Sequence, residues 1–521
     1  MTRTVDMRLT GKISLMICVV AAVLLVAWPH SVAAGAPGEE RVRKAAVAGQ
    51  FYPSEREELL GTVTRLMDSA KRQTFSEPVR AILAPHAGYD FCGRTMAAAY
   101  KQIEGPAFQY DTVILIGPSH GFATAGAAVS SATVWETPLG PVKVDREACR
   151  RFVETSDRIE FDDRPHAQEH SLEVQLPFLM VAARGKPFKV VPVVTSSSDT
   201  LDHQMIARAL VQVASRQGTL IVVSSDFSHF PDAKAAEIID KNMLSAIASL
   251  NAEILSQEDR KIIKAAHSNV SCTLCGLEAV LSFQRAAAAL GITKAAAIDY
   301  SHSGTTTGDN KRVVGYGAMI FAGPWNLVDP KSLPLVTISL NDESRKELLS
   351  MVRAAVKAAV QGDWVSYLPS ANPELQIKAG CFVTLKNRGK LRGCIGGFKS
   401  DAPLWKTARE IAVLSATNDA RFAHERIKPE EVPELQIEVS ILSPMRRVSR
   451  PLEEIQLGRD GIVVQDKGQS GTFLPQVATE TVWSLEEFLG HCSRDKAGLS
   501  WEGWKSPTAV VYAYTATIVS E

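Results

Sequence analysis

The chain has little cysteine and no excess charge of either sign, and each of these features excludes a class of protein. Eight cysteines among 521 residues are too few for a fold held together by disulfides. Lys plus Arg and Asp plus Glu number 57 each, so the formal net charge is zero. A general nucleic-acid binder needs a basic excess, so nucleic acid is not an expected partner. The 45% hydrophobic and 22% charged fractions are those of a globular protein and exclude a disordered chain, a collagen and a multi-span membrane protein.

Several common catalytic motifs are also missing. The sequence has no GxxxxGK[ST] phosphate loop, no GxGxxG after an expected strand and no HExxH zinc motif. One CxxC pair, Cys272 and Cys275, has no second pair to accompany it, so a four-cysteine zinc site is not expected. No internal repeat or low-complexity segment is present.

The first 36 residues have the pattern of an export signal. Basic residues precede an apolar run from Ile13 to Trp28, and small residues follow up to Ala36. This pattern predicts a signal peptide over residues 1–36 and a periplasmic or otherwise extracytoplasmic body. The alternative is an uncleaved anchor in the inner membrane, since the apolar run is only slightly short for a spanning helix. Any membrane contact would then be made through this segment.

Residues 43–323 are expected to form one α/β domain, with a mainly parallel sheet flanked by helices. Apolar strand-like runs alternate there with longer helical patterns, which is typical of such a sheet. The expected strands are 81–84, 112–116, 189–194, 219–223 and 315–321. The expected helices are 56–69, 171–183, 201–215, 233–249 and 275–290.

A change of pattern predicts a second domain. Pro324, Pro330 and Pro334 interrupt the alternation, so residues 324–336 are expected to be a linker and 337–521 a smaller α+β domain. Its expected helices are 342–360, 403–417 and 484–492, and its expected strands are 435–442, 461–464 and 509–519. A hairpin is expected between 381–385 and 391–395, because Asn387-Arg388-Gly389 is favourable turn sequence.

Histidines follow three of the expected strands. The loops after these strands contain His86, His120 and, beyond Asp226, His229. Ligands of an open parallel sheet bind beyond the carboxyl ends of its strands, so these side chains are predicted to converge. Imidazole suits both metal binding and proton transfer near neutral pH.

Two further segments have more than one interpretation. His170 and Glu173 lie at i, i+3 spacing at an expected helix start, so they either join the site or form an N-terminal cap with an acidic first turn. Cys272 and Cys275 open another expected helix, a position that lowers the pKa of a thiol. They are interpreted as metal ligands, as a redox pair or as small core residues.

Residues 45–322 resemble the Memo family, also called AmmeMemoRadiSam system protein B. The stretches that carry the resemblance are 48–53 (AGQFYP), 84–89 (APHAGY), 117–120 (GPSH), 169–173 (EHSLE) with 176–177 (LP), 224–229 (SSDFSH) and 274–276 (LCG). The resemblance implies a fold similar to class III extradiol dioxygenases. It also implies an Fe(II) or copper ion bound by His86, His120 and Cys275, with Asp226 and His229 in the same pocket.

Residues 335–521 resemble the AMMECR family, or AmmeMemoRadiSam system protein A. The carriers are 391–396 (LRGCIG), 418–422 (NDARF), 438–443 (EVSILS) and 474–478 (LPQVA). That family usually has proline where Ala420 stands, which bears on the turn before Arg421. The chain therefore resembles a fusion of proteins A and B, and the system's name implies a radical SAM protein as partner.

Two functions are compatible with these features. The first is a metal-dependent redox enzyme in which His229 is the general acid or base, oriented by Asp226, while His170 and Glu173 support the ligands. Its substrate is an unidentified small molecule or peptide. The alternative is a non-catalytic metal-binding adaptor whose AMMECR-type domain binds a partner or substrate. The hairpin strand 391–396 is then either a docking edge or simply a tightly packed glycine-rich strand.

Overall fold

The computed structural model describes residues 22–23, 41–265, 269–325 and 335–521. The predicted export segment therefore lies outside the described residues, apart from the two-residue strand β1 (Ala22–Val23). Within the described ranges, no helix is long and apolar enough to cross a membrane.

The first domain is built on a sheet of 11 strands in the described part of the chain, in the order β11-β12-β3-β10-β4-β9-β7-β6-β2. The central strands β3, β10, β4 and β9 run parallel, whereas β12 and β11 lie antiparallel at one edge. Strand β5 pairs with β9 and with β8. The strands are β2 (Val42–Arg43), β3 (Val79–Ala84), β4 (Thr112–Pro118), β5 (Ala127–Val129), β6 (Val134–Thr137), β7 (Gly140–Val144), β8 (Ile159–Phe161), β9 (Lys189–Thr195), β10 (Thr219–Ser224), β11 (Lys294–His302) and β12 (Gly315–Ala322).

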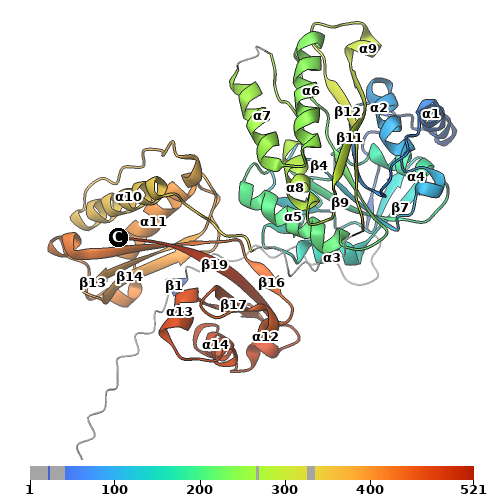
Figure 1. Cartoon of the computed structure of the whole chain (residues 1–521). Helices are drawn as coiled ribbons and strands as arrows, with labels where there is room; N and C mark the ends of the chain where they lie inside the picture. The colour runs from blue at the N-terminus through green and yellow to red at the C-terminus, as the bar shows by residue number, and fades with distance from the viewer. Residues whose placement is uncertain (1–21, 24–40, 266–268, 326–334) are drawn as a thin grey trace, which may run out of the picture.

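Helices cover both faces of this sheet (Figure 1). On one side α1, α2 and α4 pack together, and on the other α5 packs against α3 and α8. The helices are α1 (Arg56–Ser69), α2 (Tyr89–Lys101), α3 (Arg146–Val153), α4 (Gln175–Ala183), α5 (Thr200–Ala214), α6 (Ala233–Ala248), α7 (Ala252–Lys264), α8 (Leu277–Ala287) and α9 (Gly304–Thr307). The predicted α/β class with a parallel-rich sheet is confirmed.

The central strands form the core because their sequences are almost entirely apolar. Every residue of β3, β4 and β10 is buried. Continuous Val/Ile/Leu runs are typical of parallel strands that carry helices on both faces. The one large core of this domain contains these strands together with α1, α2, α5 and α8.

The segment that contains His170 and Glu173 differs from the expectation. The helix predicted from residue 171 begins at Gln175, and residues 171–174 form turns. These residues have other hydrogen-bond partners: Glu169 accepts the amide of Ser171, and Glu173 bonds to the N-terminal segment. His170 and Glu173 therefore do not share a helix face.

The second domain contains a sheet of 8 strands within the described residues, in the order β1-β14-β13-β15-β19-β17-β18, with β16 beside β19. The strands are β13 (Cys381–Asn387), β14 (Lys390–Gly397), β15 (Leu435–Leu442), β16 (Arg446–Val448), β17 (Asp460–Asp466), β18 (Gln469–Phe473) and β19 (Val510–Ser520). The helices are α10 (Asp342–Gln361), α11 (Leu404–Thr417), α12 (Pro451–Glu454), α13 (Pro475–Glu480) and α14 (Leu485–His491).

Long strand β19 joins the two halves of this second sheet. It pairs with β15 in the half that α10 and α11 cover, and with β16 and β17 in the other half. The predicted hairpin is present as β13 and β14. Its turn has positive φ at Arg388 (50°) and Gly389 (77°), the combination that a two-residue hairpin turn favours.

Candidate metal centre

Three neighbouring strands bring the predicted histidines to one place. Strands β3, β10 and β4 lie side by side and parallel, so their carboxyl ends meet at one edge of the sheet. His86 follows β3 and His120 follows β4. Cys275 reaches the same edge from the turn before α8, because its amide donates to the carbonyl of Asp226 after β10 (3.3 Å).

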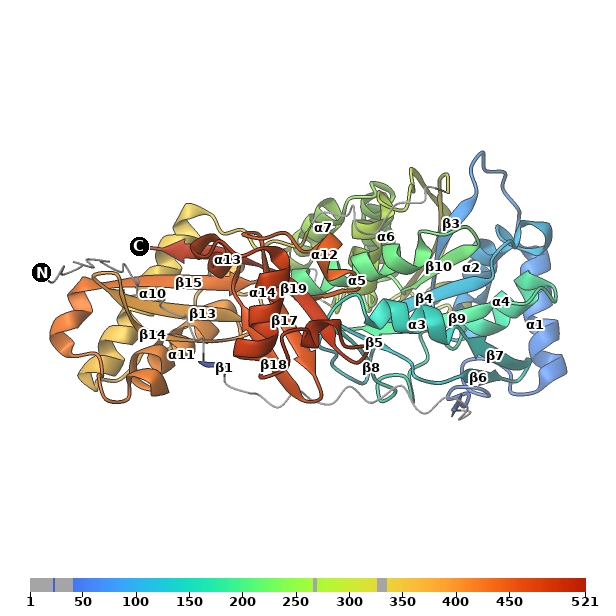
Figure 2. The same ribbon diagram turned by 90° about the horizontal axis from the view of Figure 1, so that it is seen from below.

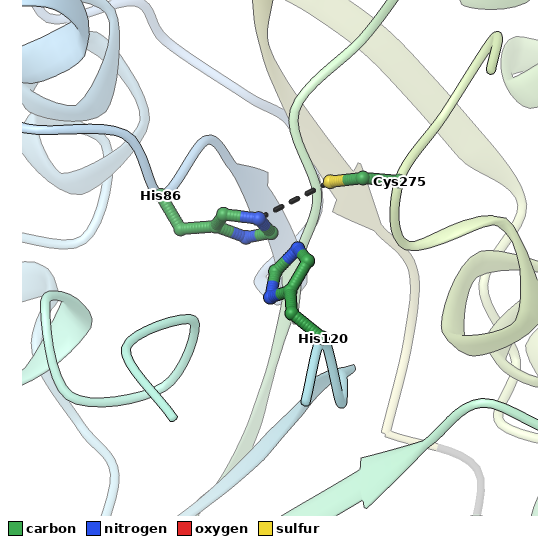
Figure 3. A group of neighbouring side chains, drawn as sticks. All are labelled: His86, His120 and Cys275. Atoms are coloured by element: carbon green, nitrogen blue, oxygen red, sulfur yellow. Dashed lines mark hydrogen bonds between the residues drawn. The ribbon is translucent and has the colours of Figure 1, made fainter. Parts of the chain in front are cut away.

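The side chains of His86, His120 and Cys275 face a common space (Figure 3). The Nε2 atom of His86 lies 3.1 Å from the Cys275 sulfur. One potential ligand atom from each of the three residues lies within 4.8 Å of the others. His86 is 1% exposed, while the His120 side chain is 36% exposed, so the group is buried on one side and open to solvent on the other.

Hydrogen bonds fix the tautomer of His86. Its Nδ1 lies 2.8 Å from the Ser224 hydroxyl, which itself donates to the carbonyl of Ser171 and accepts from the Gln175 amide. Because the single hydroxyl proton is already used, Nδ1 of His86 must carry the proton in this bond. Its Nε2 then carries the lone pair, which lies within hydrogen-bonding distance of the Cys275 thiol.

Glu169 fixes His120 in the same way. The carboxylate accepts the backbone N–H of His120 (2.6 Å) and lies 3.0 Å from its Nδ1. Burial alone would raise the pKa of Glu169, but hydrogen bonds from His120 and Ser171 lower it well below its usual range. An ionised carboxylate only accepts, so Nδ1 of His120 is protonated. Burial would lower the pKa of His120, but the hydrogen bond and charge of Glu169 raise it, so Nε2 can bind a metal only in the neutral form of the ring. Glu169 was not predicted to belong to the site. Its position next to His170 in the sequence could have indicated that it lies near the same group of side chains.

The thiol of Cys275 lies beside the His86 ring and is held by the segment after β10. Its sulfur accepts the N–H of Asp226 at 3.2 Å. A Cβ at the next residue, Gly276, would lie 2.6 Å from the Ser224 carbonyl, so this close approach to β10 requires glycine. Burial, reinforced by the nearby Asp226 carboxyl, raises the pKa of Cys275 well above its ordinary value. The predicted lowering at a helix start is therefore wrong, because burial outweighs it and α8 begins only at Leu277.

Asp226 supports the loop after β3. Its Oδ1 accepts the backbone N–H of His86 at 2.7 Å, and no hydrogen bond joins it to His229 among the described residues. Burial raises its pKa to about 7. Asp226 therefore contacts the cluster through the backbone of a ligand candidate, and it does not orient His229 as expected.

His229 approaches the cluster with an unused nitrogen. Its backbone is held by Cys272, whose carbonyl accepts its N–H (3.1 Å). The Nε2 atom is buried and has no hydrogen-bond partner. Burial, together with the charge of His120, lowers the pKa of His229 to about 4, so the ring is neutral at neutral pH. The next residue, Phe230, has φ of 75°, a strained conformation for a bulky side chain.

The other two predicted site residues, His170 and Glu173, lie in different surroundings. The ring of His170 stacks on that of His120, with centroids 4.8 Å apart, and also contacts Phe51. Glu173 instead forms a buried ion pair with Arg43. Its carboxylate also accepts the hydroxyl of Tyr52 and the backbone N–H groups of residues 46 and 47. Glu173 thus anchors the N-terminal segment of the domain, whereas His170 lies beside His120 in the candidate metal centre.

Two sequence patterns in these loops are coincidental. Residues 117–121 (GPSHG) fit GxSxG, but that nucleophile motif needs a strand–turn–helix, and β4 is followed here by a loop and then by β5. Residues 166–170 (HAQEH) fit the HxxEH zinc motif. His166, however, is buried, with its Nε2 3.2 Å from the Ala128 carbonyl, in a stretch of turns without a helix.

The donor set fits a transition metal. Two imidazole side chains and one thiol converge, and neighbours already fix the ring orientations, as is usual around metal-binding histidines. Imidazole with thiolate suits copper, iron or zinc, so the set does not choose the metal. All seven cysteines in the described ranges are free, including Cys272, which is not part of the candidate group.

The glycine-rich strand of the second domain is tightly packed. Cys394 is fully buried, and its sulfur accepts a hydrogen bond from Thr384 (3.3 Å). Asp419 accepts the N–H of Cys394 and binds the guanidinium of Arg421 through both carboxylate oxygens. These contacts hold strand β14 to the segment that follows α11.

Comparisons with known proteins match both halves of the chain. The family model described as "Memo-like protein" matches residues 43–320, and the model described as "AMMECR1" matches residues 349–519. A MEMO1 family protein of Aquifex aeolicus is 40% identical over 283 residues, which are 54% of this chain and 99% of that protein. A MEMO1 family protein of Nitrosopumilus maritimus is 33% identical over 291 residues and is covered to 99%.

Among solved structures, an uncharacterized protein of Pyrococcus horikoshii is 36% identical, with a TM-score of 0.32. That match covers 34% of this chain and 92% of the other. The Memo-like match spans more than half of the present chain, and the AMMECR1 match follows it without overlap. The chain therefore belongs to the Memo-like protein family and carries an AMMECR1 domain fused behind its Memo-like domain.

Proposed function

We propose that the Memo-like domain is a metal-dependent redox protein that acts on a small molecule or peptide. The observation that carries the proposal is the convergence of two imidazole Nε2 atoms and one thiol, with both Nδ1 protons already engaged by Ser224 and Glu169. His86, His120 and Cys275 would hold the ion. Iron or copper in this position would supply one-electron redox chemistry.

The chain's own residues supply the proton handling. His229 offers a buried, unpartnered Nε2 beside the cluster, and its neutral ring can accept a proton from a bound substrate. The open side lies at His120 and His170, which are 36% and 22% exposed in their side chains. Substrate would therefore approach over these two stacked rings, with Phe51 beside them.

A second candidate function is a non-catalytic metal-binding adaptor in which the AMMECR1 domain binds a partner. One observation favours it: strand β1 pairs in parallel with β14 at Ile395 and Gly396. Addition of a strand to a sheet edge is a common mode of peptide recognition. A radical SAM protein as that partner, and export directed by residues 1–36, stay predictions.

Metal analysis of purified variants tests the proposal. We expect stoichiometric iron or copper in the wild type and its loss in His86→Ala, His120→Ala and Cys275→Ala. Cys272→Ala is the matched control, because it removes a thiol from the same loop but not from the candidate group. Unchanged metal in the first three variants would refute the site. If the metal is lost as expected, oxygen uptake separates the two candidate functions. Metal-dependent oxygen consumption would favour the redox protein. No oxygen consumption with any substrate tried would favour the adaptor.

A further inference from the structure

A short loop of the Memo-like domain is buried against the AMMECR1 domain. Asp157, between α3 and β8, exchanges two hydrogen bonds with Met445: its N–H donates to the Met445 carbonyl (3.3 Å), and its Oδ1 accepts the Met445 N–H (3.2 Å). The Lys399 ammonium donates to the Asp157 carbonyl (2.6 Å) and lies 3.6 Å from its carboxylate. The Asp157 side chain is only 3% exposed, so the second domain desolvates a charge and also pairs it.

The next residue extends this contact to helix α5. Arg158 binds Asp202 (2.7 Å) and lies 3.5 Å from Asp199, and it donates to the carbonyl of Lys378 in the second domain. The N–H of Lys378 donates back to Asp199 at 3.0 Å. Beside them Leu201, 4% exposed, packs into the core of the second domain. We call this set of residues the docking surface: Asp157, Arg158, Asp199 and Leu201.

The docking surface also braces the loop that carries His120. This loop, residues 119–126, runs from β4 to β5. At its end the N–H of Ala127 donates to the Arg158 carbonyl (3.2 Å), and a Cβ on Gly126 would lie 1.9 Å from that same oxygen. In its middle, Thr124 exchanges two 2.8 Å hydrogen bonds with Ser196, three residues before Asp199.

We propose that the AMMECR1 domain docks on this surface as a positioning module, and that docking orders the loop that carries His120. In Figure 2, β5 and β8, which flank the contacts to Arg158, lie on the side of the Memo-like domain nearest to β17 and β18. The second domain covers Asp157 and bonds to Asp199 and Arg158, so undocking would remove the contacts that hold the residues next to both braces of the loop. The proposal holds with or without a bound metal.

Hydrogen exchange on the intact, metal-free chain tests the coupling. Lys399→Glu places a negative charge against Asp157 and leaves the Memo-like domain's own sequence unchanged. We expect amides in residues 119–127 to exchange about tenfold faster in this variant, because local opening becomes easier. Lys406→Glu is the control: Lys406 lies on the same domain and, within the described part of the chain, forms an ion pair with Glu410 alone (3.8 Å). Exchange unchanged by Lys399→Glu would overturn the coupling.

Cleavage of the linker tests the docking itself. A protease site inserted between Trp325 and Leu335 of the full-length chain allows the two domains to be separated covalently. We expect the cut wild type and the cut Lys406→Glu variant to elute as one species, and the cut Lys399→Glu variant to elute as two. Separation of the cut wild type would overturn the proposal. Neither measurement involves the metal, so failure here is distinct from failure of the proposed function.

Discussion

At the scale of single residues, the candidate metal centre depends on which nitrogen of each histidine carries its proton. Ser224 and Glu169 hold the Nδ1 protons, so a metal would bind His86 and His120 through their Nε2 atoms. The sequence predicts both histidines from their place after apolar strands. It does not predict their tautomers, since Ser224 and Glu169 come from segments that only the folded sheet brings beside them.

Glu169→Gln tests this support. The amide keeps the size of the side chain but loses the charge that orients and polarises the His120 ring. Loss of such a partner typically weakens metal binding by about 10–100-fold, which competition against a chelator measures. Glu160→Gln is the control, because Glu160 is exposed on nearby β8. An unchanged affinity in Glu169→Gln would contradict a role for the Glu169 charge in metal binding.

Glu173→Ala separates a structural role from a catalytic one. The substitution leaves the buried Arg43 guanidinium without its carboxylate, which costs about 3–5 kcal/mol of unfolding free energy. Urea unfolding measures this loss, and we expect the folded variant to keep its full metal content. Normal stability combined with lost activity would instead return Glu173 to the catalytic group. The sequence could not distinguish these roles, because the catalytic interpretation required His170 and Glu173 to share a helix face. The helix begins only at Gln175, and its first residue was not predictable from the sequence.

At the scale of elements, the sequence predicts the parts with strong periodicity. Helix α1 begins and ends at the predicted residues, and all five predicted strands of the first domain are present. The short strands β5 and β8 were not predicted, because three residues carry no periodic signal and their pairing depends on distant β9. These strands matter for the further inference, since β5 follows the loop that carries His120 and β8 follows Arg158 of the docking surface.

The contact between α6 and β11 predicts a pH dependence of stability. Asp240 on α6 accepts the hydroxyl of Tyr300 on β11 (2.7 Å) and the N–H of Ser228 (3.0 Å). Burial raises the pKa of Asp240 to about 6, above its value in the unfolded chain. The stabilisation from the neutral acid is therefore complete below the unfolded pKa and is lost as pH rises through about 6.

Asp240→Asn removes this titration. Between about pH 4 and about pH 8 the unfolding free energy of the variant should gain up to about 3 kcal/mol relative to the wild type, from a shift of about two pKa units. Urea unfolding at several pH values measures the difference. A difference that stays constant across this range would show that Asp240 titrates normally in the folded protein.

At the scale of the whole molecule, two domains with separate cores meet at a contact rich in buried charge. The sequence predicts two domains from the prolines between them and from two resemblances. It cannot predict how they dock, because Asp157 and Arg158 form an ordinary polar loop until Lys399, Met445 and Lys378 are brought against them. The second domain therefore contacts Arg158, whose carbonyl accepts a hydrogen bond from the end of the loop that carries His120.

X-ray absorption spectroscopy of the iron- or copper-loaded protein tests the metal centre most directly. We predict one sulfur scatterer at about 2.3 Å together with imidazole nitrogens, a signature typical of a thiolate and histidine site. The sulfur should disappear in Cys275→Ser and persist in Cys272→Ser. A wild-type spectrum with no sulfur neighbour, or one whose sulfur survives in Cys275→Ser, would contradict the assignment of His86, His120 and Cys275 as the ligands.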